Sequence, residues 1–94
     1  MEMPVINKCD ATECAYNRDE QCHAMAITVG GPGDHKCDTF LRSSKKGGSV
    51  DVTGRVGACK VESCKHNHAL ECSAPGITIG HEGDVVSCLT FAAT

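Results

Sequence analysis

Residues 9–22 read CDATECAYNRDEQC, and residues 59–72 repeat their cysteine spacing in the segment CKVESCKHNHALEC. A fourth cysteine follows each segment, at Cys37 in the first copy and at Cys88 in the second. The spacing is therefore C-x4-C-x7-C-x14-C, followed by C-x4-C-x7-C-x15-C. Self-similarity at a fixed period of this size is the signature of an internal repeat. The chain is a tandem duplication of a four-cysteine module.

The duplication divides the chain into three parts. We expect a first four-cysteine module at residues 1–41, a linker at 42–57 and a second module at 58–94. Residues 43–49, SSKKGGS, have the composition of a flexible linker. Such a linker is expected to couple the two modules little.

Alternating apolar residues predict a β-hairpin in each module. Ile27 and Val29, with Met25 before them, and Ile77 and Ile79 in the second copy, recur with the period of two of a strand that buries one face. A glycine-rich turn follows at 30–34 or 80–84, and a second strand is expected over 36–41 or 85–91. The segment between the second and third cysteines has room for one helical turn. Each module is thus a cysteine knuckle plus a short β-hairpin.

The composition indicates that these modules need a cross-link. The chain has 94 residues, eight of them Cys, no Trp, and only seventeen Leu, Ile, Val and Phe together, about 18%. Domains this small rarely bury enough apolar surface to be stable without metals or disulfides. The first residues do not resemble a signal peptide, and no apolar run is long enough for a transmembrane helix. We therefore expect no membrane association and a cytoplasmic protein, in which cysteines are more often metal ligands than disulfides.

One tetrahedral zinc site per module is the favoured interpretation. Structural zinc takes four ligands and readily takes four thiolates. The fold class predicted is a small metal-stabilised, cysteine-rich protein with two Zn2+ per chain. Its predicted ligands are Cys9, Cys14, Cys22 and Cys37 in the first module, and Cys59, Cys64, Cys72 and Cys88 in the second. Two alternatives stay open, namely two disulfides per module and an iron–sulfur centre.

The histidines are predicted to lie outside the ligand set. No histidine occurs at the same position in both copies, whereas all four cysteines do. Two copies of one site should share their ligands, so the five histidines are expected to be surface residues. His23 and His66 are the closest to cysteines in sequence and are the candidates for exceptions.

No catalytic motif accompanies the cysteines. Four thiolates fill the coordination shell of zinc, whereas catalytic zinc keeps one position open, so we do not expect an enzyme. Ionising all eight thiols and adding two Zn2+ would take the net charge from -3 to about -7, which disfavours nucleic-acid binding. The predicted function is a non-catalytic zinc-binding protein that mediates interaction with an unidentified protein partner. Alternatives are metal homeostasis or thiol redox sensing with labile zinc, and a disulfide-stapled scaffold.

The first copy also resembles a known family. The residues that carry the likeness are the four cysteines with Asn17, Ala24, Ile27, Thr28, Thr39 and Phe40, and the second copy matches through Asn67, Ala74, Ile77, Thr78, Thr90 and Phe91. The family is the bacterial domain of unknown function 1540, found mainly in Gram-positive bacteria and often in tandem. The resemblance implies metal binding through the cysteines and a Gram-positive source, and it implies no activity. The second copy departs from it at His66 and Ser73.

Overall fold

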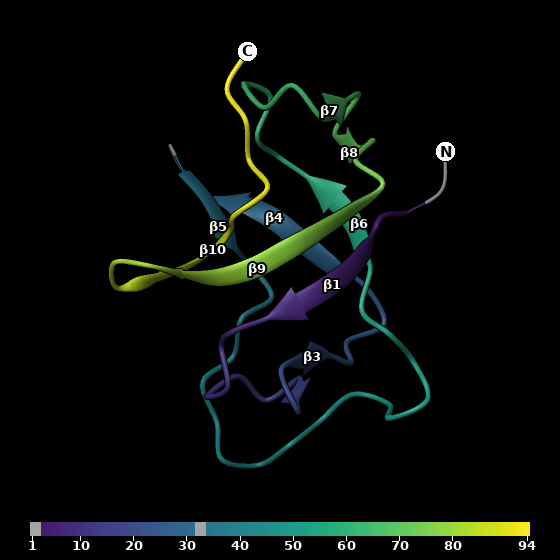
Figure 1. Ribbon diagram of the computed structural model, residues 1–94, viewed down its shortest axis with the longest axis vertical. Helices are drawn as coiled ribbons and strands as arrows, with labels where there is room; N and C mark the ends of the chain where they lie inside the picture. The colour runs from purple at the N-terminus through teal and green to yellow at the C-terminus, as the bar shows by residue number, and fades with distance from the viewer. Residues whose placement is uncertain (1–2, 32–33) are drawn as a thin grey trace.

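The computed structural model describes residues 3–31 and 34–94 (Figure 1). All of its regular elements within these ranges are β-strands. The strands of the first repeat are β1 (Val5–Cys9), β2 (Asn17–Arg18), β3 (Gln21–Cys22), β4 (Ile27–Gly31) and β5 (Asp34–Cys37). Those of the second repeat are β6 (Val56–Cys59), β7 (Asn67–His68), β8 (Glu71–Cys72), β9 (Gly76–Glu82) and β10 (Val85–Cys88).

Six of the strands form one sheet that combines both repeats. Its order is β1-β9-β10-β5-β4-β6, with β1 parallel to β9, β4 parallel to β6, and the two hairpins joined by an antiparallel contact between β10 and β5. The edge strands also meet, because Ile6 N–H donates to Gly54 O at 2.8 Å and Val56 N–H donates to Pro4 O at 2.9 Å. The sheet therefore closes on itself.

The repeats exchange their first strands within this sheet. Strand β1 of the first repeat pairs with β9 of the second, and β6 of the second repeat pairs with β4 of the first. Sequence boundaries at residues 41 and 58 describe the repeat, but the sheet crosses both of them. This differs from the expected arrangement of two loosely coupled modules, because each hairpin needs a parallel neighbour that the other repeat supplies.

The core lies inside the closed sheet. Its largest buried side chains alternate along the strands, as the sequence predicted for Ile27, Val29, Ile77 and Ile79, each at most 3% exposed. Ile6 and Val56 of the exchanged strands complete the core. Met25 does not belong to the buried face; it precedes β4 and is 74% exposed.

The predicted hairpins are confirmed as β4–β5 and β9–β10, with shifted ends. Each second strand stops at its cysteine, Cys37 or Cys88, because the chain then turns so that Thr39 Oγ1 accepts from Thr28 N–H and Thr90 Oγ1 accepts from Thr78 N–H, both at 3.0 Å. The predicted glycine-rich turn at 30–34 includes residues 32 and 33, which lie outside the described residues.

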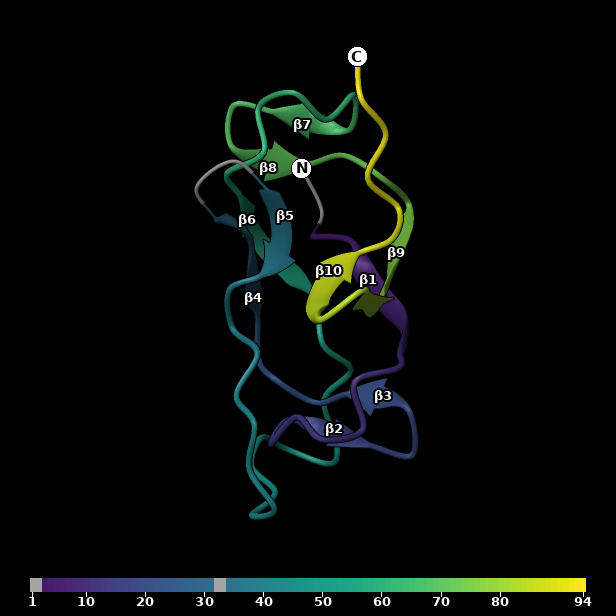
Figure 2. The same ribbon diagram turned by 90° about the vertical axis from the view of Figure 1, so that its left-hand side faces the viewer.

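A small hairpin replaces the helical turn expected between the second and third cysteines. Strands β2 and β3 pair in the first repeat, and β7 and β8 pair in the second. Both connecting residues have positive φ, 53° and 63° at Asp19 and Glu20, and 54° and 68° at Ala69 and Leu70. Two successive positive φ values are typical of the type I′ turn, a two-residue loop that connects the two strands of a hairpin. The two small hairpins lie at opposite ends of the molecule (Figure 2).

The segment expected to be a flexible linker packs against the first repeat. Gly47 N–H donates to Ala15 O at 2.7 Å, Ser49 N–H to His23 O at 3.1 Å, and Gly54 N–H to Cys22 O at 2.6 Å. The reason is that residues 42–57 must return the chain to the sheet for β6 to begin at Val56. In the parts of the chain described, no helix is long and apolar enough to cross a membrane.

Candidate metal centre

The four cysteines of the first repeat line a single cavity of about 20 Å³. Tyr16 and Phe40 of the same repeat form part of its wall, and Ile79 and Val86 of the second repeat close it from the sheet. Three of the cysteines are buried and Cys37 is partly buried. The cavity is therefore small, apolar and thiol-lined, and strands of both repeats shape it.

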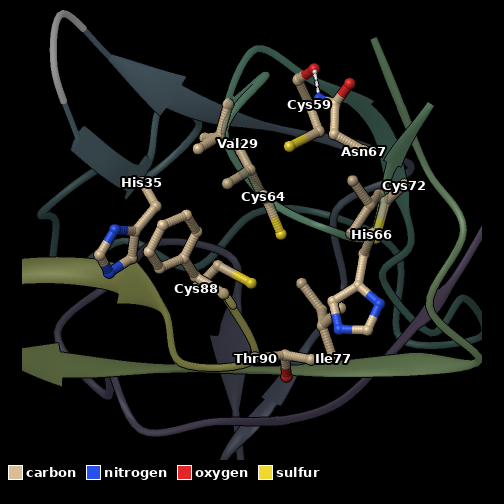
Figure 3. A pocket seen from close by; sticks show the side chains of 13 residues that line it. Val29, His35, Cys59, Cys64, His66, Asn67, Cys72, Ile77, Cys88 and Thr90 are labelled. Carbon is tan, nitrogen blue, oxygen red and sulfur yellow. Dashed lines mark hydrogen bonds between the residues drawn. The ribbon is translucent and has the colours of Figure 1, made fainter. Parts of the chain in front are cut away.

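The second repeat forms an equivalent cavity, also of about 20 Å³ (Figure 3). It is lined by Cys59, Cys64, Cys72 and Cys88, all of them buried, and by Phe91 at the position that corresponds to Phe40. The first repeat contributes Val29 and His35 to its wall. The structure thus brings together the predicted cysteines in two groups of four, one group per repeat.

An asparagine holds the start of each cysteine segment in place. Asn17 Nδ2 donates to Cys9 O at 2.8 Å, and Asn67 Nδ2 donates to Cys59 O at the same distance. The side-chain oxygen of Asn17 also accepts from Glu20 N–H at 3.2 Å in the small hairpin. The asparagine therefore ties the strand that ends at the first cysteine to the hairpin that carries the third, which explains why this residue occurs in both copies.

Backbone N–H groups point at the sulfur atoms two residues before them. The N–H groups of Ala11, Ala24 and Thr39 donate to Cys9, Cys22 and Cys37, and those of Ala74 and Thr90 donate to Cys72 and Cys88. Each of these hydrogen bonds favours the thiolate and lowers the pKa of its cysteine. The same geometry recurs in both repeats, so it belongs to the module.

Burial acts in the opposite direction and is the larger effect without a cation. It raises the pKa of Cys37 to about 12 and that of Cys88 to about 11. Neighbouring thiols of the same repeat raise the pKa further, Cys14 and Cys22 in the case of Cys37 and Cys72 in the case of Cys88. Clustered, desolvated thiols of this kind ionise readily only when a positive charge compensates them.

The donor set matches a structural metal in number and type. Four thiols that line one cavity are the ligands that tetrahedral zinc takes. Among the described residues, however, no three His, Cys, Asp or Glu side chains already stand in the geometry of a cage around an ion. All eight cysteines are free thiols. Binding a metal would therefore require the sulfurs of each cavity to draw together by side-chain adjustment.

Most histidines have partners away from the sulfur atoms. His23 Nδ1 lies 2.8 Å from Val52 O, and His81 Nε2 lies 2.8 Å from Glu13 Oε2. His35 and His66 both line the second cavity. His66 was a candidate from its closeness to Cys64 in sequence, whereas His35 was missed, because only the contact between β5 and β10 brings it to the other repeat's cysteines.

Comparison with known proteins identifies the family of both repeats. The model of a family described as a domain of unknown function (DUF1540) matches residues 8–40 and 58–91, which together contain all eight cysteines. The chain belongs to this family. It carries two tandem copies of the domain, as the residues of the two repeats predicted. Neither the curated proteins nor the solved structures include one that matches this chain.

Proposed function

We propose that this DUF1540 protein is a non-catalytic metal-binding protein that holds one zinc ion in each repeat. The observation that carries the proposal is the convergence of four thiols on one small cavity in each repeat. The zinc would supply the positive charge that lets the buried thiols ionise, and the backbone N–H groups at Ala11, Ala24, Thr39, Ala74 and Thr90 would stabilise the thiolates once formed.

The metal would also stabilise the fold. Among the described residues, the closed sheet fully buries no Leu, Met, Phe or Tyr, and its largest enclosed side chains are isoleucines such as Ile6, Ile27, Ile77 and Ile79. Structural zinc supplies about 10–16 kcal/mol of apparent binding free energy in zinc-finger peptides. That is as large as the whole free energy of unfolding of a typical domain, about 5–15 kcal/mol. The proposal assumes a reducing compartment, the cytoplasm of a Gram-positive bacterium, in which the thiols stay reduced.

Native mass spectrometry of anaerobically purified protein tests the proposal directly. We expect two zinc ions on a fully reduced chain, one ion after Cys22→Ser, and two ions after His81→Ala, because His81 binds Glu13 at the surface. A chain that carries iron and sulfide, or a metal-free chain lighter by about 8 Da from four disulfides, would overturn the zinc assignment and favour one of the two alternatives left open by the sequence.

We propose further that the protein acts by binding another protein. Support comes from apolar side chains on the surface, where Met25 is 74% and Val50 62% exposed. An open groove between the repeats adds to this, because Pro4 and Arg55 line it together with Ala74 and Pro75. Photo-crosslinkers placed at Met25 and, as a control, at exposed Lys45 test the idea in cells. Crosslinks to one defined protein at Met25 and none at Lys45 are expected; equal, diffuse labelling at both positions would argue against it.

One observation favours labile zinc as a second candidate function. Cys37 is only partly buried, whereas the other seven cysteines are buried, and it opens onto a surface groove with Lys36, Asp38 and Asp84. A ligand cysteine that borders a surface groove is where an oxidant or a competing thiol would first attack a bound metal site. Mild peroxide should then release zinc from the first repeat before the second. Retention of both zinc ions under these conditions would contradict labile zinc and would favour a purely structural role for the metal.

A further inference from the structure

The linings of the two cavities differ at five positions that the repeat and the strand exchange make equivalent. Three of these exchange one aliphatic side chain for another, and at the other two the second cavity has a histidine. Tyr16 lines the first cavity where His66 lines the second. Val86 of β10 lines the first cavity, and His35 of β5 lines the second. Val86 precedes Ser87 and His35 precedes Lys36, and Ser87 and Lys36 are the paired residues that join these two strands. At both positions the second cavity has an imidazole where the first cavity has a side chain that does not bind zinc.

His35 is not free to turn toward the sulfur atoms. Its Nε2 lies 2.9 Å from Glu82 Oε1, and its ring stacks on Phe91 with centroids 4.4 Å apart and planes 7° from parallel. Rotation of the ring would break both contacts. His35 therefore acts as a wall of the cavity, and it holds Phe91 over the cysteines.

His66 is placed differently. It follows Cys64 by two residues, and its backbone is fixed because Ser73 N–H and Ser73 Oγ both donate to His66 O, at 2.7 and 2.8 Å. Its imidazole lines the cavity toward which the sulfurs of Cys59, Cys64 and Cys88 point (Figure 3). In the first repeat His23 replaces Ser73, so only a backbone N–H holds the carbonyl of Tyr16, at 2.8 Å.

We propose that His66 is a reserve ligand of the second metal site, so that this site holds zinc with three thiolates and one imidazole after losing one cysteine, whereas the first site does not. The inference rests on the proposed zinc binding. Three cysteines and one histidine are an established ligand set for structural zinc. The phenol of Tyr16 offers no equivalent, because structural zinc is bound by thiolate, imidazole and carboxylate groups.

Matched cysteine variants in the full chain test the proposal. Cys14 and Cys64 are equivalent in the repeat and equally buried, at 7% exposure. Zinc per chain is counted by native mass spectrometry for Cys14→Ser and Cys64→Ser, and again after adding His66→Tyr to the second and Tyr16→His to the first. The Co2+ forms of the same proteins are compared by absorption, because the intensity of the sulfur-to-cobalt band reports the number of thiolates bound.

We expect two zinc ions on Cys64→Ser and one on Cys14→Ser. Adding His66→Tyr should remove the second ion from Cys64→Ser, and adding Tyr16→His should restore it to Cys14→Ser. Equal losses in the two single variants, or an ion that survives Cys64→Ser with His66→Tyr, would overturn the role of His66. Wild-type protein without any zinc would instead overturn the proposed function, so the two failures are distinguishable.

A measurement without cysteine substitution guards against variants that fail to fold. In Cd2+-loaded wild-type protein, a thiol-alkylating reagent is added stepwise until peptide mapping shows one modified cysteine in the second repeat. The second site should then bind an imidazole, visible as 113Cd–15N coupling in protein labelled at histidine. The same spectrum from His66→Tyr should lack the coupling. A coupling present in both proteins, or in neither, would contradict the proposal.

Discussion

Cys9 of the first repeat lies beside Ile79 of the second in a parallel pair of strands, and Asp10 N–H donates to Ile79 O at 2.9 Å just beyond it. The other repeat mirrors this contact, because Cys59 lies beside Val29 and Lys60 N–H donates to Val29 O at 2.7 Å. The first ligand of each proposed site is thus held by a strand of the other repeat. The two sites share one framework.

The shared framework predicts that the repeats unfold together. Cys22→Ser should remove the metal from the first cavity, loosen β1 and thereby withdraw the parallel neighbour of β9. We expect a single urea transition for the wild-type protein and a lower urea midpoint for both repeats in the variant. The NMR amide signals of Ile27 and Ile77 report the unfolding of the first and the second repeat. Two separate transitions, with Ile77 unaffected, would show that the linker insulates the repeats, as its composition alone had suggested.

The asparagine clamps give a second prediction. Asn17 is 2% exposed and donates to Cys9 O, so Asn17→Ala leaves a buried carbonyl without its partner and should lower the free energy of unfolding by about 1–3 kcal/mol. Asn67 makes the same bond in a more exposed setting, and Asn67→Ala should cost less. Urea unfolding measures both. Asn7→Ala, at an exposed position, is the control and should change stability by less than about 0.5 kcal/mol.

The sequence predicted the local features of this fold better than its long-range ones. Alternation of Ile27 with Val29 and of Ile77 with Ile79 reveals a hairpin because one face of a strand is buried. Strand exchange leaves no such signal, since Ile6 and Val56 have the same pattern whichever hairpin they join. The grouping of the cysteines followed from the repeat, whereas the place of His35 depended on pairing across repeats.

Gly54 provides a third prediction, because it lies against a proposed ligand. A Cβ at this position would stand 2.5 Å from Cys22 Sγ and 2.8 Å from Cys22 Cβ. Gly54→Ala should therefore displace Cys22, cost about 1–3 kcal/mol and weaken zinc binding in the first repeat. Gly47→Ala is the matched control, since its Cβ would meet only Tyr16, at 3.7 Å. If both variants keep two zinc ions equally well against a chelator, Cys22 tolerates the crowding and is not rigidly placed.

The small hairpin of the second repeat predicts a stabilising change. Ala69 and Leu70 have φ of 54° and 68°, a conformation that costs side-chain-bearing residues energy and that Asn-Gly adopts readily. Leu70 is 51% exposed, so its side chain contributes little to the core. Ala69→Asn with Leu70→Gly should raise the free energy of unfolding by about 0.5–1 kcal/mol. Leu41→Gly is the control: Leu41 is 52% exposed but has no positive φ, so glycine should destabilise the protein there. Thermal unfolding of the metal-loaded proteins measures the change in stability. A less stable Asn-Gly variant would mean that the contacts of the Leu70 side chain outweigh the strain of its positive φ.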